Sequence, residues 1–168
     1  MSNLYIITGP AGVGKSTISR RIAESKNKSA LIEGDEIYHQ VVSGYVQAWK
    51  EGNHLDTFWK ICLSSIETYL EDGYDVIFNY IVNSENVELI KNKLKNHTIK
   101  FVVLVVDEKT LLLRDKERPE DCQMKERCIV LLNSFKNKKY DIKNILNTTN
   151  LSIEETINII ENTNQFIL

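Results

Sequence analysis

A stretch near the N-terminus constrains this chain more than any other feature. Residues 9–17 read Gly-Pro-Ala-Gly-Val-Gly-Lys-Ser-Thr and match the pattern G-x-x-x-x-G-K-[ST] in full. Residues 4–8 before it form an apolar run, and Ile18, Ile22 and Ala23 after it recur at helical spacing. The stretch therefore has the strand-turn-helix setting of a phosphate-binding loop, which disfavours a chance match by a glycine-rich turn.

The residue types in this loop suit a nucleoside triphosphate. Glycines lack Cβ, so backbone N–H groups can turn inward around a phosphate, and the following helix adds the positive end of its dipole. We expect Lys15 to reach the β and γ phosphate oxygens and the Ser16 hydroxyl to ligate Mg²⁺. The loop residues expected to bind ATP are Gly9, Ala11, Gly12, Val13, Gly14, Lys15, Ser16 and Thr17.

Length and composition predict a single domain over residues 1–168. The chain is 42% hydrophobic and has only 7 Gly and 2 Pro, which suits one globular core rather than two. Its formal net charge of -2 supplies no basic field for non-specific nucleic-acid binding. We therefore expect a small-molecule partner and no nucleic acid, with the protein a monomer or a homodimer.

Cysteine spacing and hydropathy exclude several other classes. Cys62, Cys122 and Cys128 are odd in number and lack C-x-x-C spacing, which argues against a disulfide framework and a zinc site. No apolar run approaches the roughly 18 residues of a membrane span, and the N-terminus lacks the pattern of a signal peptide. These observations predict a cytoplasmic protein without a membrane partner.

Apolar runs alternate with helical patterns from end to end. Strands are expected at residues 4–8, 30–33, 76–78, 99–106 and 141–146. Helices are expected at 15–25, as one or two short pieces within 36–52, at 56–70, 87–96 and 129–135, and after the capping box of Ser152 and Glu155. This alternation predicts an α/β fold with three α/β/α layers. Its five-stranded parallel sheet would bind ligands at the carboxyl ends of the strands.

Residues 107–128 change abruptly to dense charge. Arg114, Arg118 and Arg127 lie in this segment among many acidic and basic neighbours. One interpretation is a helical lid that closes over the site. The other is an exposed helix held by ion pairs at i, i+4 spacing, which alternating charges would also give.

The loop GPAGVGKST, the Gly34-Asp35 pair after the second strand and the arginine-rich flap carry a family resemblance. The chain resembles the small P-loop kinases of the nucleoside-monophosphate-kinase-like group. Within that group it is most similar to the branch of gluconate kinase, shikimate kinase and chloramphenicol phosphotransferase. The resemblance covers nearly the whole chain and implies Mg²⁺-dependent transfer of the γ-phosphoryl group of ATP to a hydroxyl of a small molecule.

The resemblance also implies roles for single residues. Asp35 would orient the acceptor hydroxyl and accept its proton, although a helix N-cap is the competing interpretation. Arg118 and Arg127 would stabilise charge on the transferred phosphoryl group. Arg114 at the lid hinge would bind the nucleotide, and Thr148 would present backbone to the adenine.

One feature departs from the group and leaves the metal site open. Asn79 follows the third strand, where similar kinases carry an Asp that holds Mg²⁺. Mg²⁺ would then rely on Ser16, the phosphates and waters, with Asn79 holding one water. The alternative is a nucleotide-binding protein without kinase turnover.

The acceptor also stays open. Gly52-Asn53-His54-Leu55-Asp56 matches the G-x-x-L-x-D stretch of gluconate kinases, but the Asp-Arg pair that follows in that family is absent. A sugar acid such as gluconate is therefore one candidate. An aromatic pocket is another, and the residues that could line it or simply pack in the core are Tyr38, Tyr45, Trp49 and Trp59.

Two further classes compete with a small-molecule kinase. A small GTPase needs an N-K-x-D element, and residues 137–140 place Tyr where Asp is required. A nucleic-acid motor or end kinase is disfavoured by the size and net charge of the chain.

Overall fold

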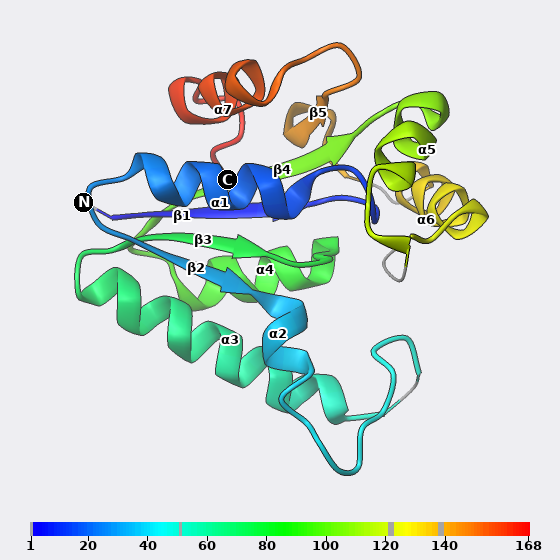
Figure 1. The fold of residues 1–168 in the computed structure, drawn as a ribbon. Helices are drawn as coiled ribbons and strands as arrows, with labels where there is room; N and C mark the ends of the chain where they lie inside the picture. Colours follow the sequence, from blue (N-terminus) through cyan, green and yellow to red (C-terminus); the bar gives the residue numbers. More distant parts are fainter. Residues whose placement is uncertain (1, 51, 121–122, 138–139) are drawn as a thin grey trace.

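The computed structural model describes residues 2–50, 52–120, 123–137 and 140–168. Its centre is a parallel sheet of five strands in the order β2-β3-β1-β4-β5 (Figure 1). The strands are β1 (Asn3–Thr8), β2 (Ser29–Glu33), β3 (Asp75–Asn79), β4 (Thr98–Val105) and β5 (Ile145–Asn147). The helices are α1 (Lys15–Ser25), α2 (Gly34–Tyr38), α3 (His54–Glu71), α4 (Ser84–Lys93), α5 (Glu108–Lys116), α6 (Glu126–Lys136) and α7 (Ile153–Asn162).

Helices cover both faces of the sheet because the strands are apolar on both sides. In β1, Leu4 and Ile6 pack on the side of α3 and α4, whereas Tyr5 and Ile7 pack on the side of α1 and α7. The α5 and α6 helices lie at the carboxyl ends of the strands (Figure 1). This arrangement confirms the predicted three-layer α/β/α fold.

The register of the sheet brings three strand ends together. Asn79, the last residue of β3, pairs with Ile7 of β1 on one side and with Glu33, the last residue of β2, on the other. Strand β1 ends at Thr8, and the phosphate-binding loop begins at the next residue. The loop and the two polar strand ends therefore share one edge of the sheet.

Most predicted elements are confirmed, with shifted ends. The α1 helix spans the predicted residues, and α4 begins at Ser84 because Asn83 forms a capping box with Asn86. The last strand is shorter than predicted, since a 3₁₀ turn (Ile142–Asn144) precedes it. The Asp141 side chain accepts a hydrogen bond from the Lys143 N–H and so stabilises this turn.

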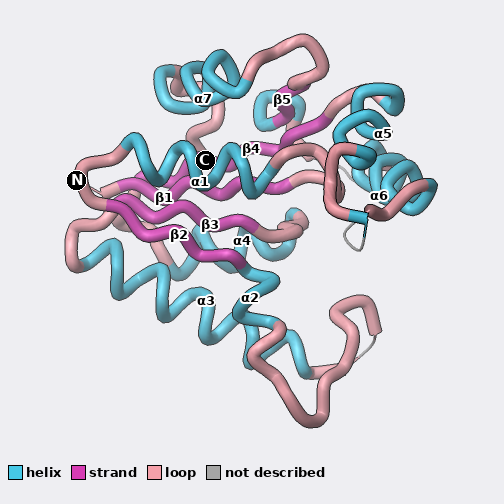
Figure 2. The backbone as a smooth tube through the Cα atoms, viewed as in Figure 1, coloured by secondary structure: helices cyan, strands magenta, loops and turns pink. Residues whose placement is uncertain are grey.

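The helices predicted within residues 36–52 are wrong beyond Tyr38. The α2 helix ends there, and residues 39–50 lie in the long loop at the lower right of Figure 2. A short helix needs a buried apolar face for its stability. Here Val41, Val42 and Trp49 are exposed, so the loop has no such face to pack.

Buried thiols account for two of the three cysteines. Cys62 and Cys128 are free, and burial raises the pKa of Cys62 to about 12, which keeps that thiol protonated. Cys122 lies outside the described residues, as do Lys138 and Lys139 of the N-K-x-D comparison. No helix in the described part of the chain is long and apolar enough to cross a membrane.

Candidate active site

The loop after β1 has the backbone geometry of a phosphate cradle. Gly9, Gly12 and Gly14 all have positive φ, which side chains with Cβ rarely adopt. Gly14 is the N-cap of α1 and makes no side-chain capping bond, so the first N–H groups of the helix point to an open end. Ser16 and Thr17 in the first turn are exposed there. An anion at this position would meet backbone donors and the positive end of the helix dipole.

Lys15 lies over this loop. Its Nζ donates a hydrogen bond to the Pro10 carbonyl at 3.1 Å. Burial lowers the pKa of Lys15 to about 8, against the opposing charge of Asp35, while the nearby Arg118 lowers it further. Asp35 and Arg118 are therefore close enough to Lys15 for their charges to shift its pKa.

Asn79 connects the loop to the end of β2. Its side-chain amide donates to the Ser16 hydroxyl at 3.0 Å and to the Glu33 carboxylate. An ionised carboxylate only accepts hydrogen bonds, so the amide NH₂ must face Glu33. The Asn79 Oδ1 is then left buried and without a hydrogen-bond partner. Sequence reasoning missed Glu33, because its position beside Asn79 depends on the pairing of β2 with β3.

These three residues fit a magnesium ion. Burial raises the pKa of the Glu33 carboxylate, although the Asn79 hydrogen bond and the charge of Arg20 oppose this shift. The orphaned Asn79 oxygen and the Ser16 hydroxyl add neutral oxygen ligands or water partners of the kind that Mg²⁺ takes. No cluster of three His, Cys, Asp or Glu occurs among the described residues, so the remaining ligands would be phosphate oxygens and waters.

Asp35 is the second residue of α2 and is exposed. The N-cap of α2 is Glu33 and makes no side-chain capping bond, so the N-cap interpretation of Asp35 is wrong. A Cβ on Gly34 would lie 2.5 Å from a ring carbon of Tyr80, so only glycine lets α2 start against that ring. The Asp35 charge consequently acts on both Tyr80 and Lys15.

Arg114 bridges the phosphate-binding loop and the loop after β5. Its guanidinium donates to the Val13 carbonyl at 2.8 Å and to the Thr148 carbonyl at 3.1 Å. Thr148 is buried, and its N–H donates to the Val105 carbonyl at 2.9 Å. The two residues predicted to contact the nucleotide are thus brought together on the β4–β5 side of the loop.

Asp115 organises the lid. This buried carboxylate accepts from the backbone N–H groups of Met124 and Lys125 and from Arg118. Burial alone would raise the pKa of Asp115, but these hydrogen bonds outweigh burial and lower it. The chain between α5 and α6 is therefore held to α5 with Arg118 on the side of Lys15.

Arg127 makes a different contact from Arg118. Its guanidinium carbon is 5.5 Å from the centre of the Trp49 ring, and Trp49 belongs to the loop of residues 39–50. The contact joins the start of α6 to this loop. In this arrangement no described contact connects Arg127 with Lys15 or Ser16.

The four aromatic residues singled out in the sequence divide evenly. Tyr38 and Trp59 are buried, whereas Tyr45 and Trp49 are exposed. Core packing for at least half of them is thereby confirmed. The turn of residues 52–56 mainly opens α3: Leu55 packs against the core, and Asp56 lies exposed in the first helical turn.

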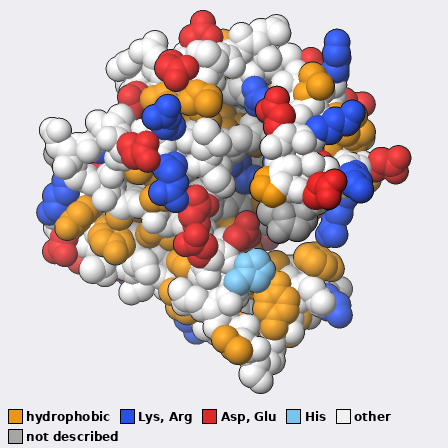
Figure 3. Space-filling model, viewed as in Figure 1, with side chains coloured by type: hydrophobic (Ala, Val, Ile, Leu, Met, Phe, Trp, Pro, Cys, Tyr) orange, Lys and Arg blue, Asp and Glu red, His pale blue; other side chains and the backbone are white. Residues whose placement is uncertain are grey.

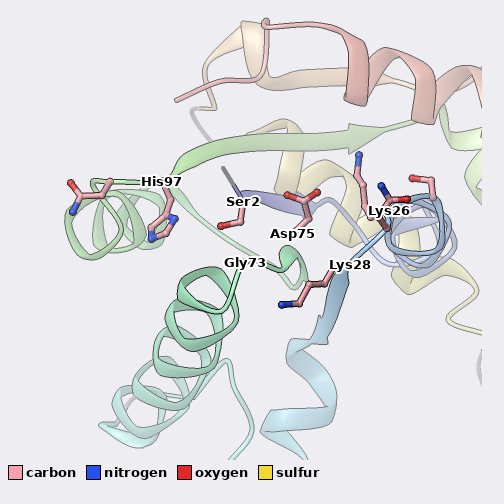
Figure 4. Close-up of a pocket in the computed structure, with 9 residues that line it drawn as sticks. Ser2, Lys26, Lys28, Gly73, Asp75 and His97 are labelled. Atoms are coloured by element: carbon pink, nitrogen blue, oxygen red, sulfur yellow. The ribbon is translucent and has the colours of Figure 1, made fainter.

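A surface hollow of about 600 Å³ lies away from this site, at the amino ends of the strands (Figure 4). Its charged groups already have partners. Lys26 pairs with Glu161, Lys28 donates to the Asp72 carbonyl, and Asp75 accepts from Asn3. The hollow therefore takes no part in the arrangement around Lys15.

Comparisons with known proteins agree with this geometry. A family model described as an AAA domain matches residues 6–138. A sugar kinase from Janibacter sp. HTCC2649 superposes with a TM-score of 0.70 at 12% identity, over 94% of this chain and 91% of that chain. A gluconokinase from Sinorhizobium meliloti 1021 gives 0.64 at 16% identity, over 92% and 87%. A chain of the Pnkp1/Rnl/Hen1 RNA repair complex gives 0.63 at 18% identity, over 83% of this chain and 46% of that chain.

No curated protein matches the chain in sequence. At such low identities the structural matches show the fold alone. That fold is the one shared by small P-loop kinases, and it confirms the resemblance seen in the sequence.

Proposed function

The chain belongs to the AAA domain family, and on that premise we propose that it transfers the γ-phosphoryl group of ATP to a hydroxyl of a small molecule. One observation carries the proposal. Lys15, the Ser16–Asn79–Glu33 group and Asp35 converge at the carboxyl ends of β1, β2 and β3. They supply a phosphate-binding cation, oxygen ligands for a metal and a carboxylate for an acceptor, which are the parts that phosphoryl transfer needs.

On the nucleotide side, the protein's own groups bind and orient the triphosphate. When ATP binds, the Lys15 ammonium group would leave its hydrogen bond to the Pro10 carbonyl and bind the β and γ phosphate oxygens instead. Arg114 fixes the loop through Val13 and holds Thr148 beside it, so the base and the phosphates would be bound by parts that are already connected. Such preorganisation spares reorganisation during the reaction.

A bound Mg²⁺ would supply positive charge against the negative charge that develops during transfer. Ser16 and Glu33 would hold it, and Asn79 would orient either Glu33 or a bound water. Glu33 would thus supply the carboxylate that Asn79, at the end of β3, lacks. A carboxylate at this place favours a working kinase over a nucleotide-binding protein without turnover.

The reaction requires one bond to form and one to break. The acceptor oxygen forms a bond to the γ-phosphorus, the bond between that phosphorus and the β,γ-bridging oxygen breaks, and ADP leaves. The acceptor proton would pass to Asp35, which is exposed toward solvent and can release it. Arg118 beside Lys15 would stabilise charge on the equatorial oxygens.

A nucleic-acid end kinase is the second candidate. The similarity to a chain of an RNA repair complex supports it, but that similarity shows only a fold. The net charge of -2 gives no electrostatic support for a polyanionic substrate. We therefore treat oligonucleotides as one arm of the tests below.

Replacing Asp35 tests the proposal. Asp35→Asn keeps the shape of the side chain but removes its charge, so we expect the rate of phosphoryl transfer to fall on the order of 10²-fold. The affinity for MgATP should change much less, because Asp35 serves the acceptor. Transfer from radiolabelled ATP and MgATP binding by calorimetry measure the two effects.

Asp56→Asn is the matched control, since Asp56 is an exposed Asp in the first turn of α3. We expect it to leave both quantities unchanged. An Asp35→Asn protein that transfers at the full rate would remove Asp35 from the mechanism. A wild-type protein that neither binds nor turns over MgATP would overturn the proposed function itself.

A further inference from the structure

Next to Asp35 lies a connected set of rings, of which Tyr38 and Phe58 are buried in the core, whereas the others are exposed or partly exposed: His39, Tyr45, His54 and Tyr80. Six ring contacts of 4.6–6.4 Å build it, as follows: Tyr38 with Tyr45, His39, His54 and Phe58, Phe58 with Tyr80, and His39 with Tyr45. We call this set the ring wall. It begins at Tyr80, whose ring covers Gly34 beside Asp35, and it ends at the exposed Tyr45 and His39.

The charges along this wall are acidic. Glu33 lies within electrostatic range of both Asp35 and Glu36. Burial raises the pKa of Tyr80, and the charge of Asp35 raises it further. Figure 3 shows acidic side chains gathered on the drawn face, next to a histidine and to hydrophobic side chains of the lower right lobe.

Basic side chains near the site are engaged elsewhere. Lys15 and Arg118 belong to the phosphate side, and Arg127 lies over Trp49. Within the described residues, no Lys or Arg makes a cation–π contact with any member of the ring wall. A carboxylate or phosphate beside the ring wall would therefore face Asp35 and its acidic neighbours, while Lys15 and Arg118 serve the phosphates of ATP. Proteins bind such acidic groups with Arg or Lys.

We propose that the acceptor is a hydroxyl compound with a planar ring and no negative charge. Aromatic side chains offer faces and edges to a flat ring, and an acidic surround tolerates a neutral or cationic ligand but repels an anion. This inference rests on the proposed kinase function and names its substrate class. It sets the chain apart from a gluconate kinase, because gluconate is a carboxylate without a planar ring.

Matched pairs of probes test the charge requirement. Each pair keeps the ring and changes the charge: uridine with uridine 5′-monophosphate, and phenyl glucoside with phenyl glucuronide. Glucose with gluconate serves as the pair without an aromatic ring, and a 5′-hydroxyl oligonucleotide serves as the polyanion. Binding to the protein saturated with MgADP is measured by calorimetry, and transfer is measured from radiolabelled ATP.

We expect at least one uncharged planar probe to bind in a saturable way, with its anionic partner roughly tenfold weaker or worse. Tyr45→Arg should narrow that ratio several-fold, because it places a cation on the ring wall. Tyr69→Arg is the matched control: Tyr69 is 41% exposed, as Tyr45 is, but lies on α3 and contacts Tyr74 instead of the ring wall. It should leave the ratio unchanged.

Three results would overturn the inference while leaving the kinase intact. One is an anionic member that binds as well as its neutral partner or better. Another is transfer to gluconate or to the oligonucleotide in preference to the planar alcohols. The third is a protein that binds and hydrolyses MgATP but binds none of the planar probes at millimolar concentration. Failure to bind MgATP at all would instead count against the proposed function.

Discussion

The two sides of the site differ in how firmly their groups are held. On the nucleotide side, Lys15, Ser16 and Arg114 each have a hydrogen-bond partner that fixes the side chain before any ligand arrives. On the proposed acceptor side, residues 39–50 form a largely exposed loop. Its anchors include the Tyr38 hydroxyl, which donates to the Val46 carbonyl, and the stack of His39 on Tyr45.

This difference separates what the two sides must do. Every nucleoside triphosphate presents the same phosphates, so a preorganised cradle is useful whatever the acceptor is. Acceptors differ, and recognition residues often lie on loops that a rigid scaffold positions. We therefore expect substitutions on the nucleotide side to act mainly on rate and metal dependence, and substitutions in the loop to act mainly on acceptor affinity.

Lys15→Ala is expected to have the largest effect. It removes the cation that would bridge the β and γ phosphates, so kcat should fall by a factor on the order of 10³. The free protein should unfold at the same temperature or higher, because the variant no longer buries an ammonium group. Steady-state kinetics and thermal unfolding without nucleotide measure the two effects.

Lys28→Ala is the control, because Lys28 lies at the other end of the sheet and donates to the Asp72 carbonyl. It should keep the wild-type kcat. Equal turnover by the Lys15→Ala and wild-type proteins would remove the phosphate-binding loop from catalysis.

Local elements of this side could be predicted from the sequence, and non-local ones could not. The strand, the loop and α1 follow one another in the chain, so their pattern predicted Lys15 and Ser16 directly. Glu33 acts beside Asn79 only because β2 pairs in parallel with β3, and a single sequence does not reveal that register. Residues 39–50 were predicted to contain helix because their apolar residues recur at mixed spacing, whereas in the fold Val41, Val42 and Trp49 face solvent.

Glu33→Gln should have the next largest effect. Glutamine can still accept the Asn79 hydrogen bond, but it lacks the charge that would attract Mg²⁺. We expect kcat/KM to fall roughly 10- to 100-fold, as for loss of a group that supports a metal site. The Mg²⁺ concentration for half-maximal rate should rise in parallel.

Titration with Mg²⁺ at saturating ATP measures this effect. Glu36→Gln is the control, because Glu36 is exposed on α2, which follows Glu33, and acts on Glu33 through its charge. A Glu33→Gln protein with the wild-type Mg²⁺ curve would mean that the metal depends on the phosphates and Ser16 alone.

The pH dependence of ATP binding should be the third largest effect. Burial lowers the pKa of Lys15 to about 8 in the free protein, and only the protonated amine can bridge phosphates. ATP affinity should therefore weaken as pH rises through 8, by roughly tenfold between pH 7.5 and pH 9 for one proton. Calorimetry across this range measures it, and Lys15→Ala should show weak binding with a flat profile.

The same shift predicts how stability changes with pH. Because the pKa of Lys15 is lower in the folded than in the unfolded protein, unfolding takes up a proton between about pH 8 and the ordinary pKa of 10.5. The contribution of Lys15 to the free energy of unfolding should therefore rise with pH in this window. A wild-type ATP affinity that stays constant from pH 7.5 to pH 9 would contradict the assignment of this proton to Lys15.

Arg127→Ala should have the smallest effect, and it tests where the two sides meet. The arginine lies over Trp49, and an exposed cation–π contact is worth about 0.5–1 kcal/mol, or about two- to fivefold in an equilibrium. We expect a loss of this size in kcat/KM for the acceptor, with little change in kcat or in ATP affinity. Trp49→Ala should cause a similar loss. The double variant should lose little more than either single variant, because both changes remove the same contact.

Arg21→Ala is the control, since Arg21 is exposed and pairs only with Glu24 on α1 among the described ion pairs. The sequence alone predicted Arg127 at the transferred phosphoryl group, where its loss would lower kcat about a hundredfold. A loss of that size in kcat, with Trp49→Ala silent, would move Arg127 from the acceptor side to the nucleotide side.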